Sequence, residues 1–175
     1  MPEGIPGIAA KAALALAGLA LLLLPAQRLF FGFMAQAPAA YAGTVPAFDL
    51  RATLDGPFVA SGAIYGPTGR VATRFTADMR GSWDATGGTL AESFRFDSGR
   101  TLERAWRLVP GEGGRFTATA DDVVGTGTGE VAGAALVLRY RLRLPESRRE
   151  VDVTDWLYLA PDGVIVNRAQ FRRFG

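Results

Sequence analysis

Apolar and polar residues alternate with a period of two over much of the chain after Phe58, a pattern that is typical of β-strands with one buried face. The clearest run extends from Arg70 to Arg80. The face predicted to be buried in this run carries Val71, Thr73, Phe75, Ala77 and Met79. Residues 136–144 repeat the alternation, with arginines on the opposite face. Each run therefore predicts a strand with one side against a core and the other in water.

Turn residues separate these runs at short intervals. Gly-containing turns are predicted at residues 66–69, 85–88, 97–99, 110–114 and 161–163. The Gly-rich run 125–130 could suggest a phosphate loop, but it lacks the Lys-Ser/Thr of that motif and the helix that should follow it. A turn or bulge is therefore predicted there. Short connections favour an antiparallel meander of about eight strands. A sheet with one apolar face must close or stack, so the fold class is all-β: an antiparallel up-and-down barrel of the lipocalin or calycin kind, with a two-sheet sandwich as the alternative.

The 97–99 turn also predicts a register. With a three-residue loop, the apolar positions match across the hairpin and Glu92 lies opposite Arg104, both on the inner face. Asp155 is in phase with the apolar positions of its own strand and is predicted to join them. These three residues form the predicted inward polar cluster, interpreted either as a ligand-binding site or as a structural ion pair of Glu92 and Arg104 near a barrel mouth. Asp121 and Asp122 are interpreted as a solvated strand end.

The N-terminal segment has a different character, because residues 12–24 are apolar without interruption. One interpretation is an uncleaved transmembrane or signal-anchor helix from about Ile5 to Gln27. The other is a cleaved signal ending at the small-x-small sequence of residues 35–37. The predicted membrane-boundary residues are Arg28, Phe30, Phe31 and Phe33. The predicted organisation is a membrane segment over 1–34, a linker over 35–42 and a β-barrel domain over 43–175.

Composition removes several kinds of chemistry. The 175 residues include no Cys and no His, which excludes disulfides, thiolate nucleophiles and Ser-His triads. The formal net charge of +2 gives no reason to expect a nucleic-acid partner. No metal, no cofactor and no catalytic residue is predicted.

Several motifs together are similar to a known family. They are Gly81-Ser82-Trp83-Asp84 before Gly88-Thr89-Leu90, the stretch from Phe94 to Leu108, the run from Ala120 to Gly125, the run from Asp155 to Leu159, and Asn167-Arg168 before Phe174-Gly175. In order and spacing, from about Tyr41 to Gly175, they resemble the bacterial family catalogued as domain of unknown function 3833. The resemblance implies an envelope-associated, lipocalin-like β domain, often a lipoprotein, with no activity that transfers to a residue of this chain. The lipobox Cys of such lipoproteins is absent here, which favours a peptide anchor.

Three functions from different classes follow. The first is a membrane-tethered barrel that binds a lipid or another small apolar molecule. The second is a structural or interaction protein of the envelope with a filled barrel, and the third is an enzyme that uses Glu92 and Arg104. The expected partners are membrane lipid and a small apolar ligand. The positive-inside bias predicts a bacterial inner-membrane protein with a cytoplasmic N-terminus and a periplasmic β domain.

Overall fold

The chain forms two compact units, Met1–Ala37 and Pro38–Gly175. The structure is a computed structural model that describes residues 5–30, 33–145 and 147–173. The first unit contains helix α1 (Ile5–Phe30) and the 3₁₀ turn η1 (Phe33–Ala35). The second contains the remaining elements, and its largest part is a β-barrel.

Helix α1 presents an unusually apolar surface. The leucines of its middle part, Leu14, Leu16, Leu19, Leu21, Leu22 and Leu23, are each more than half exposed. The apolar run therefore forms a helix with no polar face over this stretch. In the part of the chain that the structure describes, no helix reaches the length and hydropathy that crossing a membrane requires. The predicted transmembrane span is thus not confirmed.

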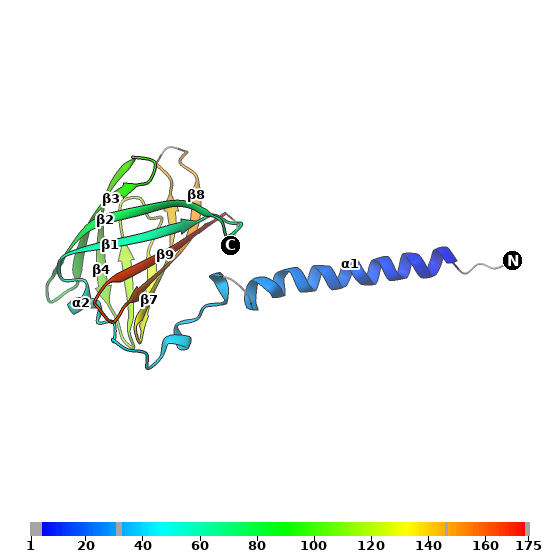
Figure 1. Ribbon diagram of the computed structural model, residues 1–175, viewed down its shortest axis with the longest axis horizontal. Coiled ribbons are helices and arrows are strands. Elements are labelled where there is room, and N and C mark those ends of the chain that lie inside the picture. The colour runs from blue at the N-terminus through cyan, green and yellow to red at the C-terminus, as the bar shows by residue number, and fades with distance from the viewer. Residues whose placement is uncertain (1–4, 31–32, 146, 174–175) are drawn as a thin grey trace. The chain divides into compact units, whose positions relative to one another are not determined.

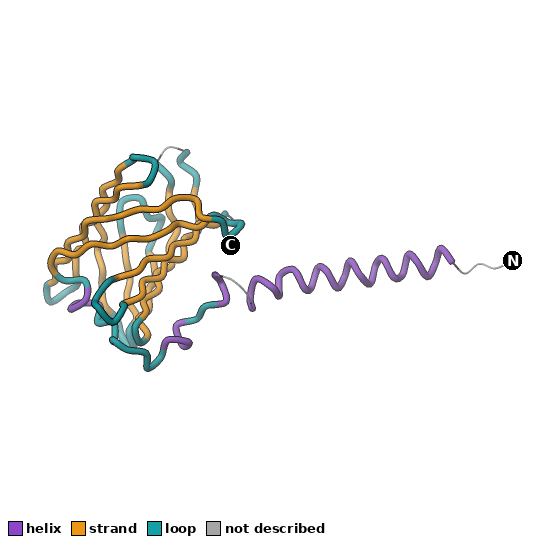
Figure 2. The backbone as a smooth tube through the Cα atoms, viewed as in Figure 1, coloured by secondary structure: helices purple, strands orange, loops and turns teal. Residues whose placement is uncertain are grey.

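The second unit is a closed barrel of nine strands, which confirms the predicted all-β barrel (Figure 1). The strands are joined in sequence order by short loops at the two ends of the barrel (Figure 2). Its elements are η2 (Pro38–Tyr41), α2 (Leu50–Thr53), β1 (Gly56–Tyr65), β2 (Val71–Trp83), β3 (Gly88–Phe96), β4 (Thr101–Pro110), β5 (Arg115–Thr119), β6 (Gly127–Ala132), β7 (Ala135–Arg143), β8 (Glu150–Leu159) and β9 (Ile165–Arg172).

The strand count differs from the predicted number of about eight. The Gly-rich run predicted as a turn or bulge in fact forms strand β6 from Gly127 onward. Gly129 pairs with Phe116 of β5, and the Phe116 ring occupies the space that a side chain at position 129 would take. The glycine is therefore a packing partner of an aromatic residue within a strand, which a turn motif does not reveal.

An odd number of strands also changes the closure of the barrel. In an up-and-down meander each strand reverses direction, so the first and ninth strands run the same way. Accordingly, β1 pairs with β9 in parallel, from Ala60 opposite Ile165 to Tyr65 opposite Gln170. All other neighbouring pairs are antiparallel. The barrel is thus antiparallel throughout except where it closes.

The predicted alternation is confirmed in the middle of β2 but not at its start, where Val71 of the predicted inner face is 51% exposed and Thr73 is only partly buried. In β2, Phe75, Ala77 and Met79 are buried while the intervening residues are exposed. The predicted β3–β4 register is confirmed as well, with Glu92 opposite Arg104 and Leu90 opposite Trp106. The side chain of Glu92 consequently points into the barrel among apolar neighbours.

One end of the barrel is sealed by the segment that precedes β1. Asp49 caps the short helix α2 through a hydrogen bond from the Ala52 amide at 2.7 Å. Leu54 follows the helix and is almost fully buried, and its carbonyl oxygen accepts a hydrogen bond from Nε1 of Trp83 at 3.3 Å. Figure 1 shows α2 at this end. The β3–β4 and β7–β8 loops lie at the opposite end, since β3 begins and β4 ends beside α2.

Candidate functional site

The interior of the barrel is not filled by side chains. It holds a cavity of about 310 Å³, whose walls are mainly aliphatic and aromatic side chains contributed by strands on every side. At the end opposite α2 the cavity is lined by Arg100, Thr101 and Pro145, which are exposed to solvent. At the other end it is lined by Leu50 and Leu54. The cavity therefore opens at the loop end and is closed by the α2 segment.

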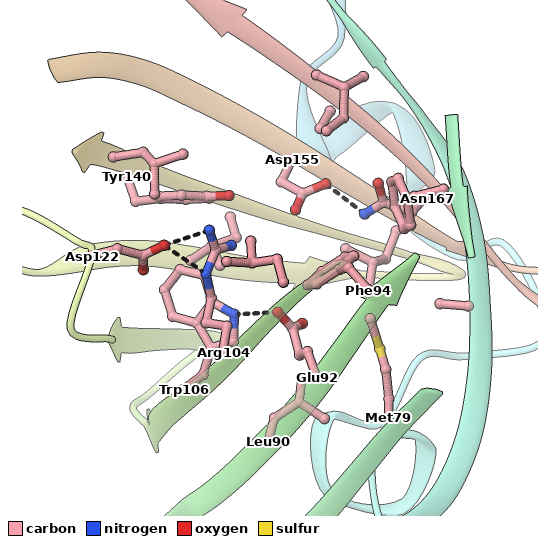
Figure 3. A pocket seen from close by; sticks show the side chains of 18 of the residues that line it. Met79, Leu90, Glu92, Phe94, Arg104, Trp106, Asp122, Tyr140, Asp155 and Asn167 are labelled. Carbon is pink, nitrogen blue, oxygen red and sulfur yellow. Dashed lines mark hydrogen bonds and ion pairs between the residues drawn. The ribbon is translucent and has the colours of Figure 1, made fainter. Parts of the chain in front are cut away.

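All three residues of the predicted inward polar cluster line this cavity: Glu92 from β3, Arg104 from β4 and Asp155 from β8. Figure 3 shows their side chains extending into the same space. Oε2 of Glu92 accepts a hydrogen bond from Nε1 of Trp106 at 3.0 Å. Oδ1 of Asp155 accepts one from Nδ2 of Asn167 at 2.6 Å. Sequence reasoning therefore located the polar part of the cavity.

The predicted ion pair of Glu92 with Arg104 is wrong, because Arg104 pairs with Asp122. Arg104 donates from Nε at 3.0 Å and from Nη2 at 2.7 Å to one oxygen, Oδ2 of Asp122. The two side chains are only 10% and 22% exposed, so this is a largely buried pair. Glu92 faces Arg104 across the hairpin but bonds to Trp106 instead. The charge of Arg104 is thus neutralised mainly by Asp122.

The interpretation of Asp122 as part of a solvated strand end is wrong, because this residue does not lie in a regular strand. Residues 120–126 are instead an irregular connection between β5 and β6. The connection is held against β7 by hydrogen bonds from the Val124 amide to the Arg141 carbonyl and from the Arg143 amide to the Asp122 carbonyl, both 2.8 Å. In such a segment the two-residue rule for side-chain direction does not hold, and Asp122 faces the cavity.

Three further polar side chains of the site were not singled out from the sequence: Trp106, Tyr140 and Asn167. A signal existed for Trp106 and Tyr140, since both occupy inward positions of alternating runs. Their rings meet edge to face at a centroid distance of 5.0 Å. Asn167 comes into the site only because β8 and β9 pair with Leu157 opposite Asn167, which places it beside Asp155.

Burial changes the acidity of the cavity-facing groups. Burial raises the pKa of Glu92 to about 7, although the Arg104 charge and the Trp106 hydrogen bond act in the opposite direction. Burial likewise raises the pKa of Asp155 to about 7, opposed by the Asn167 hydrogen bond and by Arg104. The pKa of Tyr140 is raised above its usual range, also mainly by burial. Both carboxyl groups therefore exchange protons near neutral pH.

The geometry suits binding by hydrogen bonds and charge. Oε1 of Glu92 and Oδ2 of Asp155 receive no hydrogen bond from any side chain that the structure describes, and both carboxyl groups face the cavity. Within residues 5–30, 33–145 and 147–173, no group of three or more carboxylates gathers in a way that could hold a metal ion. The site thus offers open acceptor atoms in an apolar enclosure.

The predicted membrane-boundary residues belong to the first unit. Phe31 lies outside the described residues, and Arg28 and Phe30 are placed in α1 without a description of their side chains. Phe33 lies in η1 and is buried. The boundary role of these residues stays a prediction.

Comparison with known proteins adds one match. A family model described as "Protein of unknown function (DUF3833)" matches residues 28–175, which include the whole barrel. No curated protein and no solved structure matches the chain. The match confirms the family resemblance expected from the motifs, and the chain therefore belongs to the DUF3833 family.

Proposed function

We propose that this protein binds one small, largely apolar molecule inside its barrel, while its apolar N-terminal segment holds it at a membrane. The observation that carries the proposal is the cavity of about 310 Å³ that opens at the loop end of a closed barrel. Small-molecule sites in proteins have volumes of about 300–1,000 Å³ and mainly apolar walls with a few polar groups. The barrel has both properties.

The alternative of a filled structural barrel agrees less well with these features. Small closed barrels without a ligand are packed by large inward side chains. Here several inward positions hold small residues, including Ala60 and Ala169, which line the cavity. An open apolar space of this size is unfavourable in water unless something occupies it. A ligand is therefore the better explanation of the interior.

The apolar surface of helix α1, in the first unit, supports the proposal of a membrane tether. The exposed leucines of α1 leave an apolar surface all round the middle of the helix, and such a surface is stable in lipid or against another apolar surface. We place the β domain in the periplasm of a bacterium, at the inner membrane, because of the distribution of basic residues around the apolar run. In this arrangement the ligand would be a lipid or another apolar molecule available from the envelope.

Binding can be measured with the full chain reconstituted in phosphatidylcholine nanodiscs. The neutral probe N-phenyl-1-naphthylamine should show saturable emission above that of empty nanodiscs, and dodecanol should compete with it. Ala169→Phe places a ring in the cavity and should abolish the saturable signal. Ala105→Phe is the matched control, since Ala105 lies on β4 with its side chain exposed. Equal probe binding by both variants would contradict the proposal.

A further inference from the structure

The balance of charge inside the cavity suggests what kind of head group a ligand has. Among the described residues, the carboxyl groups that line the cavity are those of Glu92, Asp122 and Asp155. Arg104 is the guanidinium among them, and it is engaged by Asp122 through two hydrogen bonds. The other arginine of the lining, Arg100, is exposed at the open end, where its guanidinium lies over the Phe96 ring at 4.9 Å. Within the part of the chain that the structure describes, neither Glu92 nor Asp155 is therefore hydrogen-bonded to a cationic side chain.

Each of these two carboxyl groups also has one oxygen that accepts no hydrogen bond from a described side chain; Oδ1 of Asp122 is unbonded too, but it is fully buried. Glu92 is 8% exposed and uses Oε2 for Trp106, which leaves Oε1 toward the cavity. Asp155 uses Oδ1 for Asn167, which leaves Oδ2. A buried carboxylate without a counter-charge is strongly unfavourable. A ligand that brings a positive charge would supply the missing partner, whereas an anionic ligand would add a further negative charge.

We infer that the ligand is a cationic amphiphile, with an apolar body in the barrel and a protonated amine held by Glu92 and Asp155. The inference rests on the proposed function and names its substrate class. The cavity volume sets the size of the body: an apolar cavity of about 150 Å³ admits one benzene molecule, and this cavity has about twice that volume. A chain of roughly twelve carbon atoms is of the right size.

The acidity of the site is consistent with this head group. The raised pKa values of Glu92 and Asp155 keep both groups partly protonated at neutral pH, and an ammonium ion would shift them to the ionised form. The charged and titratable groups that face them are Arg104, Asp122 and Tyr140, besides each other. Binding of an amine should therefore strengthen as the pH rises from about 6 to about 8, where an alkylamine is still protonated.

Three probes with one chain length separate the possibilities: dodecylamine, dodecanol and dodecanoate. Each would compete with N-phenyl-1-naphthylamine on the full chain in phosphatidylcholine nanodiscs. For the native chain we expect dodecylamine to bind about tenfold or more tightly than dodecanoate, because only the ammonium group forms charge-assisted hydrogen bonds with the two carboxylates. Partition into the nanodisc is the same for every variant, so differences between variants report the cavity.

Glu92→Gln and Asp155→Asn, each alone, should reduce the preference for dodecylamine while dodecanol binding stays within about twofold. Glu103→Gln is the matched control, because Glu103 is an exposed carboxylate on β4 beside Arg104. Equal or tighter binding of dodecanoate to the native chain would overturn the inference, as would an unchanged preference in both cavity variants. In either case dodecanol binding would still support the proposed function, whereas loss of binding of all three probes to the native chain would overturn both.

Discussion

Arg104 donates two hydrogen bonds to Oδ2 of Asp122, at 3.0 and 2.7 Å, although its partner across the β3–β4 hairpin is Glu92. The pair connects a strand to the irregular segment between β5 and β6. It therefore fixes a loop at the open end of the barrel and, at the same time, removes the positive charge that Glu92 would otherwise receive.

Removing Asp122 should leave Arg104 largely buried without its main counter-charge. We expect Asp122→Asn to lower the free energy of unfolding by about 3 kcal/mol, because breaking a buried pair on one side exposes the remaining charge to an apolar environment. Thermal unfolding of the full chain in mild detergent, followed by far-ultraviolet circular dichroism, measures this change. Asp121→Asn is the matched control, since Asp121 is exposed. Similar melting temperatures for the two variants would mean that the pair contributes little.

The acidity of Glu92 predicts a pH dependence of stability. Its pKa of about 7 in the folded protein lies above the value of 4.5 expected for the unfolded chain, so between these values the folded state holds a proton that the unfolded chain has lost. Stability should therefore fall as the pH rises through this window, by about 1.4 kcal/mol per pH unit for each such group. Asp155, with a folded pKa of about 7, acts in the same direction.

Glu92→Gln separates this effect from other titrations, because glutamine resembles the protonated acid and still accepts from Trp106. The variant should nearly equal the native chain in stability at pH 4, below both pKa values, and exceed it at pH 8. Denaturant titration at both pH values tests this expectation. A surface carboxylate such as Asp84 has the opposite effect on stability, because hydrogen bonds from Thr86 lower its pKa to about 2. The stability that Asp84 contributes is therefore lost only as the pH falls toward that value. A variant equally stable or weaker at pH 8 would contradict the prediction.

Close packing of Phe116 on Gly129 predicts a steric effect in β6. A Cβ at position 129 would overlap the Phe116 ring, which is itself 4% exposed. Gly129→Ala should therefore lower the free energy of unfolding by about 1–3 kcal/mol, as is usual for overpacking. Combining it with Phe116→Leu should recover part of the loss. Gly66→Ala is the control, because the nearest atom to its Cβ is the Arg70 carbonyl oxygen at 3.9 Å.

Close packing of Gly81 against Leu54 holds the end of the barrel that the α2 segment closes. A Cβ at Gly81 would overlap the carbonyl oxygen of Leu54, to which Trp83 donates its hydrogen bond. Gly81→Ala should therefore displace the segment 48–55 and accelerate its amide hydrogen exchange, while protection in β7 changes little. Exchange measured by mass spectrometry resolves the two regions. Unchanged exchange in 48–55 would show that this contact does not hold the seal.

Much of the site could be predicted because strand alternation and hairpin register are local properties. The 97–99 turn fixed which residues of β3 and β4 face each other, and the apolar positions fixed which face is inward. Together these placed Glu92 and Arg104 in the barrel interior. Asp155 followed from the same alternation in β8. These predictions needed no knowledge of distant contacts.

Other features depended on contacts between residues far apart in the chain. The partner of Arg104 is eighteen residues away in an irregular segment, so no periodicity indicated it. Likewise Gly129 lies in a strand opposite Phe116, whose ring covers the glycine, and no local motif indicates this contact.

By itself, the sequence determined an apolar N-terminal segment and a β-barrel with an acidic and basic pair on its inner face, because alternation and turn chemistry act over a few residues. The tertiary structure decided the parallel closure of β1 on β9, the pairing of Arg104 with Asp122 and the volume left in the interior. These three depend on how nine strands and their loops come together in space. The charge balance of the cavity, and with it the proposed ligand, is therefore a property of the assembled barrel.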